Sequence, residues 1–146
     1  MTFNNEKELK NFLLNKCKSA LIKSQEQVYQ IINRFVKKYY AEFSPEMYER
    51  TYQLYKSLVK SDIRPSANGY EAYVYFDLSS LGYTTGLKPS GEQVMQAAEW
   101  GRHGAMGLAV ADFKGTSIWR EPLEILNADA INILKKELIA QGIPIK

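Results

Sequence analysis

Residues 6–40 read EKELKNFLLNKCKSALIKSQEQVYQIINRFVKKYY, and their apolar side chains recur at steps of three and four. The positions on this stripe are Leu9, Phe12, Leu13, Cys17, Ala20, Leu21, Val28, Ile31, Ile32, Phe35 and Tyr39. That period is typical of one helix face. We therefore predict a helix over these residues, about 50 Å long and longer than a small domain needs. A break between Lys23 and Gln27, giving two shorter helices, is the alternative.

A central hairpin is predicted after this helix. Ser44-Pro45 has the chemistry of a helix start and predicts a short helix. Residues 70–77 alternate between two faces and are rich in aromatic and β-branched side chains, which favours a strand. Residues 57–64 read as its antiparallel partner, with turn residues at 65–69 that include a glycine tolerant of positive φ.

The C-terminal part predicts a surface loop, two helices and an irregular arm. The loop covers residues 78–88. Ser90 and Gln93 form a capping box that opens the first helix, which Gly101 ends. The second helix is expected over 128–140, with Asn127 as its cap and Gly142 as its stop.

The predicted fold class is α+β, with a long N-terminal helix and a C-terminal helix packed on a small antiparallel sheet with a central hairpin. A length of 146 residues fits one domain over 1–146. Its parts are the long helix (1–42), the short helix and hairpin (44–89), and the helix, flexible arm and C-terminal helix (90–146).

Charge distribution and cysteine content indicate the surface character and the cellular compartment of the protein. Residues 1–60 carry 11 basic and 6 acidic side chains, a balance of +5, whereas residues 61–146 carry 8 and 10, a balance of −2. Cys17 is the single cysteine, so the chain forms no internal disulfide and a reducing compartment is the simple interpretation. Because no apolar run resembles a secretory signal or a membrane span, we expect a soluble protein made in the cytoplasm.

Catalytic chemistry has little support in the sequence. His103 is the single histidine and sits in a glycine-bearing stretch, so a serine or cysteine nucleophile has one candidate base. A nuclease would need convergent acids, and Asp62, Glu71 and Asp77 around the hairpin match no metal-binding spacing. We expect no enzyme activity, no metal and no cofactor, and a small hydrolase or nuclease is the weakest alternative.

The basic side of the first helix gives a second alternative, a small nucleic-acid-binding module. Its cations are Lys16, Lys23, Arg34, Lys37 and Lys38, which could contact phosphates and would make binding sensitive to salt. Interspersed glutamates dilute this positive charge, and an ordinary solvated helix face is the competing interpretation.

Several segments together resemble a known family. They are Tyr48-Glu49-Arg50-Thr51-Tyr52-Gln53-Leu54 leading into Ser57-Leu58, the hairpin Asn68 to Asp77, Trp100-Gly101-Arg102-His103-Gly104, Ile118-Trp119-Arg120-Glu121-Pro122, and the closing helix through Leu134-Lys135-Lys136. In this order they resemble the head–tail joining, or tail-completion, proteins of long-tailed bacteriophages, the group that includes the minor tail protein Z of phage lambda. The resemblance covers nearly the whole chain.

The resemblance implies a structural virion protein that assembles as a homo-oligomeric ring at the neck, after synthesis in the host cytoplasm. The implied partners are other copies of the chain, the head connector, and tail-tube or tail-terminator proteins, with DNA passing through the neck and no membrane involved. We expect the first helix and the arm over 101–120 to form the contact surfaces. The candidate interaction residues are Lys16, Lys23, Arg34, Lys37, Trp100, Arg102, His103 and Trp119.

Overall fold

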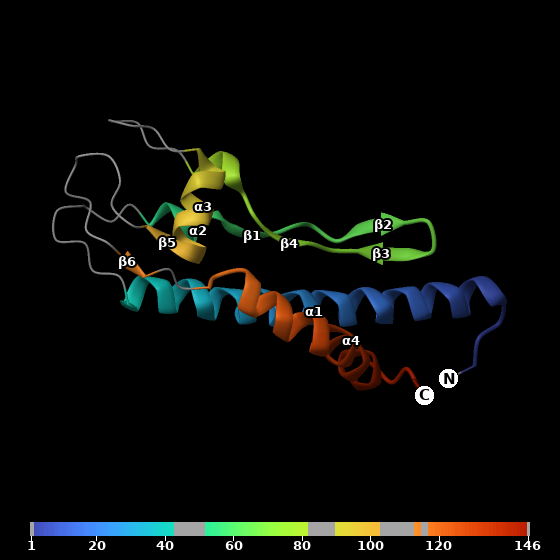
Figure 1. The fold of residues 1–146 in the computed structure, drawn as a ribbon. Coiled ribbons are helices and arrows are strands. Elements are labelled where there is room, and N and C mark those ends of the chain that lie inside the picture. The colour runs from blue at the N-terminus through green and yellow to red at the C-terminus, as the bar shows by residue number, and fades with distance from the viewer. Residues whose placement is uncertain (1, 43–51, 82–89, 103–112, 115–116, 146) are drawn as a thin grey trace.

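Two long helices and a long hairpin make up most of the protein in the computed structural model, which describes residues 2–42, 52–81, 90–102, 113–114 and 117–145 (Figure 1). Helix α1 (Glu6–Glu42) lies between the hairpin on one side and α4 (Arg120–Ala140) on the other. The predicted α+β class, with terminal helices on a small antiparallel sheet, is confirmed.

Helix α1 runs unbroken over 37 residues, so the alternative of two shorter helices is wrong. No proline or glycine interrupts residues 23–27, and the Ser24 hydroxyl donates to the carbonyl of Ala20 at 2.9 Å inside the helix. At its start, the Asn5 side chain accepts a hydrogen bond from the backbone N–H of Glu8 at 2.9 Å, which satisfies one free donor of the first turn. The helix is about 55 Å long.

The predicted hairpin exists, but it is two short antiparallel ladders separated by a bulge. Strand β1 (Leu58–Lys60) pairs with β4 (Val74–Phe76), and β2 (Arg64–Ser66) pairs with β3 (Gly69–Glu71). Residues 61–63 face residues 72–73, so one strand carries an extra residue there. The predicted turn was too wide: residues 67–68 connect β2 to β3, and Gly69 lies in β3 without positive φ.

Ser61 and Gln25 hold the bulge together. The Ser61 hydroxyl accepts a hydrogen bond from the backbone N–H of Tyr73 at 2.8 Å, in place of a ladder carbonyl. The Gln25 side-chain amide, on α1, donates to the carbonyls of Ser61 and Tyr73, each at 2.9 Å. This side chain therefore helps to fix the position of the hairpin along α1.

Short elements flank the hairpin in the chain. Helix α2 (Gln53–Ser57) follows residue 52, while the predicted start at Ser44-Pro45 lies outside the described residues. The predicted loop over 78–88 begins instead with a 3₁₀ turn, η1 (Leu78–Ser80), and its remainder from residue 82 on lies outside the described residues. Helix α3 (Gly91–Trp100) then leads into β5 (Gly101–Arg102), which pairs with β6 (Phe113–Lys114).

The predicted capping box of α3 is confirmed. The Ser90 hydroxyl accepts from the N–H of Gln93 at 3.3 Å, and the Gln93 side chain accepts from the N–H of Ser90 at 2.9 Å. Glycine at position 91 allows α3 to lie close to η1. A Cβ atom at this position would lie 2.3 Å from the carbonyl oxygen of Leu78.

Helix α4 begins at Arg120, eight residues before the predicted start, so Asn127 is not its cap. Its end agrees with the prediction. Gly142 has φ of 81°, its N–H donates to the carbonyl of Ile139 at 2.8 Å, and the N–H of Ile143 donates to that of Leu138 at 3.1 Å. These two bonds form a Schellman motif, which satisfies the last free carbonyls of the helix.

Two buried clusters join these elements. The first joins α1 to β1 and α4 and consists of Ile32, Val36, Leu58 and Leu126. The second lies beside α2 and α3 and consists of Leu54, Leu81, Ala98 and Ile118. Both clusters lie along the C-terminal half of α1, which leaves the N-terminal half of that helix with fewer buried side chains.

Candidate interaction surfaces

Three of the predicted interaction residues share one side of α1. Lys16, Lys23 and Lys37 are separated by seven and fourteen residues, so a continuous helix aligns them at intervals of about 10 Å per seven residues. Lys23 and Lys37 are exposed, and Lys16 is half-buried with its ammonium 5.5 Å from the centroid of the Phe12 ring. The unbroken helix therefore creates the basic row that the sequence indicated.

This basic row is not neutralised within the described part of the chain. Among the described residues, ion pairs join Lys38 to Glu42 and Lys60 to Glu26, and none involves Lys16, Lys23 or Lys37. Exposed ammonium groups without a carboxylate partner are available to an anionic surface, whether protein or nucleic acid.

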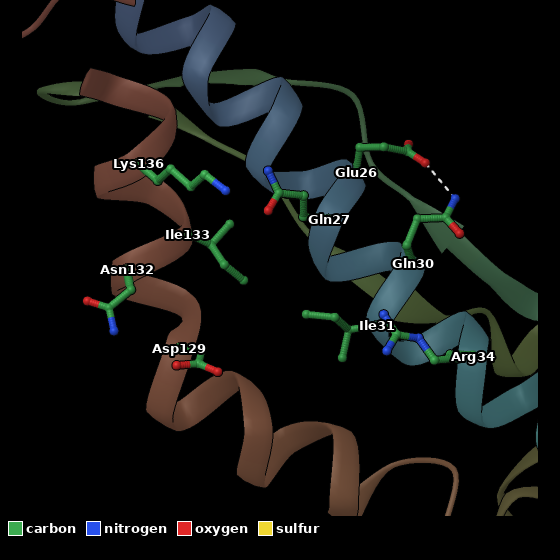
Figure 2. A pocket seen from close by; sticks show the side chains of 9 residues that line it. All are labelled: Glu26, Gln27, Gln30, Ile31, Arg34, Asp129, Asn132, Ile133 and Lys136. Carbon is green, nitrogen blue, oxygen red and sulfur yellow. Dashed lines mark hydrogen bonds between the residues drawn. The ribbon is translucent and has the colours of Figure 1, made fainter. Parts of the chain in front are cut away.

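Arg34 lies on the same side of α1, 18 residues or five turns beyond Lys16, and it lines an open depression of about 480 Å³ between α1 and α4 (Figure 2). The depression is lined by Glu26, Gln27, Gln30, Ile31, Arg34, Asp129, Asn132, Ile133 and Lys136. Ile31 and Ile133 point toward each other between the helices, with polar side chains of both charge signs around them. A lining of both charge signs favours neither an anionic nor a cationic ligand. We therefore interpret the depression as a polar seam between the helices.

Hydrogen bonds satisfy several polar side chains in and beside this seam. The Gln27 amide donates to the Glu137 carboxylate at 2.5 Å, which links α1 to α4. Glu26 accepts a hydrogen bond from Gln30 at 2.7 Å and another from Lys60 of β1. The bond from Gln30, followed by that from Lys60, holds the pKa of Glu26 below its ordinary value.

Trp100 lies at the C-terminal end of α3 and is 62% exposed, the most of any described aromatic side chain. The guanidinium carbon of Arg120, the first residue of α4, lies 4.8 Å from the centroid of its ring. This cation–π contact joins the two ends of the segment that the sequence predicted as an arm. An exposed tryptophan beside an arginine has the composition of an interface hot spot.

Glu99 fixes the same junction from inside. Its carboxylate accepts hydrogen bonds from the Ser117 hydroxyl at 2.7 Å, the N–H of Trp119 at 2.8 Å and the N–H of Arg120 at 3.3 Å. The Ser117 hydroxyl in turn accepts from the N–H of Glu121 at 3.1 Å. The free donors at the start of α4 are therefore satisfied by residues outside that helix.

The remaining predicted residues divide between the core and the undescribed part. Trp119 is half-buried and packs edge-on against Phe76 of β4 with ring centroids 5.7 Å apart. This packing gives Trp119 a structural role, while its role in binding stays a prediction. Arg102 lies in β5, its side chain is outside the described part, and His103 also lies outside the described residues.

Sequence reasoning missed an apolar stripe on α4. Leu123, Ile131, Leu134 and Leu138 lie on one side of this helix, while Leu126 lies on another side, in the core. Ile131 is 68% exposed and Leu134 is 36% exposed. Ile131, Leu134 and Leu138 lie within the helix predicted over 128–140, but the sequence does not say which side of that helix α1 covers.

The described residues present neither a metal-binding cluster nor a membrane-spanning helix. No group of three or more His, Cys, Asp or Glu side chains there is placed to hold a metal ion. Within the same residues, no helix has the length and apolar character that a membrane crossing requires.

Comparison with known proteins gives the family. Searches of curated proteins and of solved structures found no match. The model of one protein family, YomN, matches residues 5–140, which is nearly the whole chain and includes α1, the hairpin and α4. The match indicates a phage-associated protein, in agreement with the bacteriophage class expected from the sequence. The chain belongs to the YomN family.

Proposed function

We propose that this protein is a structural component of a tailed phage or prophage that assembles as a homo-oligomeric ring at the neck. There it completes the tail or joins it to the head, in contact with the head connector and with tail-tube or tail-terminator proteins. Its role is mechanical rather than catalytic. The family match supports the phage setting, and the resemblance to head–tail joining proteins supports the position at the neck.

The observation that carries this proposal is the exposure of apolar side chains on both long helices. Leu9 and Leu13 on α1 are 39% and 41% exposed, and Ile131 on α4 is 68% exposed. Single exposed apolar residues are ordinary, but Leu9 and Leu13 recur at helical spacing on the part of α1 that extends beyond the buried clusters, and Ile131 lies on the side of α4 away from Leu126 and Ile133. Surfaces of this kind favour a subunit that is completed by neighbours.

The junction of α3 and α4 supports a second contact. Trp100 and Arg120 present an aromatic ring and a guanidinium at the base of the predicted arm, and Glu99 holds that base rigid. Rigid anchors of this composition contribute strongly to protein interfaces. The neighbouring virion protein is the partner that this contact fits.

Deletion of the gene from its phage or prophage tests the proposal. The expected result is filled heads and separate tails that do not join, with normal particles restored by the intact gene supplied in trans. Normal numbers of infectious particles without the protein would contradict the proposal. A defect confined to DNA replication or packaging would instead favour the nucleic-acid-binding alternative.

A further inference from the structure

The hairpin has a base that is fixed to α1 and a tip that is held less firmly. The base is the ladder of β1 and β4, which is anchored by Leu58 in the core and by the ion pair of Lys60 with Glu26 of α1. The tip (residues 62–72) contains β2 and β3 and lies over the N-terminal half of α1 (Figure 1). No residue of the tip is buried, and neither buried cluster includes one.

One cation–π contact is the main interaction between the tip and α1. The Lys18 ammonium on α1 lies 5.7 Å from the centroid of the Tyr70 ring on β3, and the residues of β3 are half-buried. Among the described residues, no hydrogen bond or ion pair links the tip to α1, since the bonds from Gln25 end at residues of the base. A cation–π contact at an exposed site stabilises only weakly, so the tip leaves α1 at a small loss of interactions.

The bulge marks the boundary between base and tip. The Gln25 amide holds the carbonyls of Ser61 and Tyr73, which are the last residues of the base. Beyond them, residues 62–63 of one strand and residue 72 of the other connect to the ladder of β2 and β3. The structure describes all of these connecting residues, and no backbone hydrogen bond joins them across the hairpin. A bulge bends and twists a hairpin locally, so the chain can change direction there while both ladders stay intact.

The tip is suited to move as one piece. Strands β2 and β3 stay paired from Arg64 and Glu71 to Ser66 and Gly69, across a connection of two residues. Their backbone hydrogen bonds lie within the tip, so they do not need α1 as a partner.

We propose that the hairpin tip is a hinged arm, which lifts from α1 about the bulge while the base stays in place. In the lifted state the Lys18 ammonium and the Tyr70 ring no longer cover each other, so both are free to contact another molecule. The core is unchanged by this motion because no tip residue belongs to it. The hinge is a property of the single chain and does not depend on the proposed place at the neck.

Distances between pairs of spin labels, measured by double electron–electron resonance on the full chain, test the hinge. In a Cys17→Ala background, Ala67→Cys and Lys10→Cys place labels at exposed positions of the tip and of α1. Tyr75→Cys and Lys37→Cys, also at exposed positions, give a reference pair on the base and α1. We expect one narrow distance distribution for the reference pair, and a second, longer distance beside the original one for the tip pair.

Changes at the contact and at the bulge should alter the share of the longer distance in opposite directions. Lys18→Met removes the cation and is expected to raise this share about two- to threefold. Lys23→Met, the same change at an exposed position of the same helix, is the control and leaves the share unchanged. Deletion of Asp62 leaves one residue opposite Ala72 and makes the ladder regular, so we expect the share to fall to less than about half.

Two outcomes overturn the hinge. One is a tip pair whose distance distribution is as narrow as that of the reference pair, both in the unchanged chain and in Lys18→Met. The other is a share of the longer distance that is the same with and without Asp62, which would place the motion outside the bulge. Circular dichroism confirms that each variant is folded, and the two labelled pairs in the otherwise unchanged chain test the hinge even if a variant fails to fold.

Discussion

The carboxylate of Glu99, at the end of α3, accepts a hydrogen bond from the backbone N–H of Trp119 at 2.8 Å and so caps a helix that begins 21 residues later. The same carboxylate reaches Ser117 and Arg120. Charge-assisted bonds to the free donors of a helix start are among the stronger hydrogen bonds in proteins. The first turn of α4 therefore depends on α3.

Removal of the Glu99 carboxylate is expected to destabilise the protein. Glu99→Ala leaves three donors without this acceptor, and we expect a loss of about 2 kcal/mol in the free energy of unfolding. Glu99→Gln keeps one acceptor oxygen and is expected to lose about half as much. Urea unfolding measures both, with the exposed Glu92→Ala on the same helix as control. Equal losses in Glu99→Ala and the control would show that the cap contributes nothing.

Gly91→Ala is expected to destabilise the protein, although alanine is the better helix former by about 1 kcal/mol. The added Cβ would lie 2.3 Å from the carbonyl oxygen of Leu78, so α3 and η1 must separate. We expect a loss of about 2 kcal/mol, as for other overpacked sites. Gly69→Ala is the control, because a Cβ there meets no atom within 4 Å. A more stable Gly91→Ala protein would contradict the close approach.

Gln25→Ala is expected to loosen the hairpin from α1. The lost amide leaves the carbonyls of Ser61 and Tyr73 without their shared donor, at a cost of about 1 to 2 kcal/mol. Hydrogen exchange should quicken at the N–H of Ser61, which donates to the Tyr73 carbonyl at 2.9 Å. Lys23→Ala, an exposed change on the same helix, should leave this exchange unchanged. Equal exchange rates in the two variants would refute the bracing role of Gln25.

Acid should remove a small part of the stability through Glu26. Its pKa is lowered in the folded protein by hydrogen bonds from Gln30 and Lys60, so the folded state binds this proton less readily than the unfolded state. The contribution is present at neutral pH and is lost as pH falls through the lowered pKa. Because Glu26 and Lys60 are well exposed, we expect less than about 1 kcal/mol.

Comparison with Glu26→Gln isolates this effect. The unchanged protein should be the more stable of the two at pH 7, and the difference should shrink below about pH 4 and in high salt. Glu92→Gln, the same change in charge at another exposed site, corrects for net charge. A difference that grows as pH falls would contradict the direction of the shift.

The sequence predicted those parts of the fold whose causes are local. The steps of three and four in residues 6–40 predicted α1, the Ser90 and Gln93 pair predicted the start of α3, and Gly142 predicted the end of α4. Each of these signals lies within a few residues of the structure that it causes. Local chemistry therefore accounts for the ends and faces of these helices.

The errors arose where distant residues decide the structure. The start of α4 was placed eight residues late because its cap comes from Glu99, on another helix. The hairpin was predicted without its bulge because Gln25 and Ser61 supply the hydrogen bonds that a regular ladder would make. The sequences of α4 and of the hairpin do not indicate that side chains on other helices, Glu99 and Gln25, bond to them.

The interaction surfaces also divide into those that follow from local spacing and those that depend on distant contacts. The row of Lys16, Lys23 and Lys37 follows from spacing alone once the helix is continuous. The α4 stripe was missed because the side of α4 that stays exposed depends on how α1 packs against Leu126 and Ile133. Residue type alone does not distinguish a tryptophan at an interface from one in the core. The Trp119 ring packs on Phe76.

Electron microscopy of particles of the phage that encodes this chain, labelled through a tag on the protein, tests the central claim most directly. Our account predicts label at the junction of head and tail, in a ring of several copies per particle. Assembled infectious particles that contain no copy of the protein would contradict it, and so would label confined to the capsid shell or the tail tip.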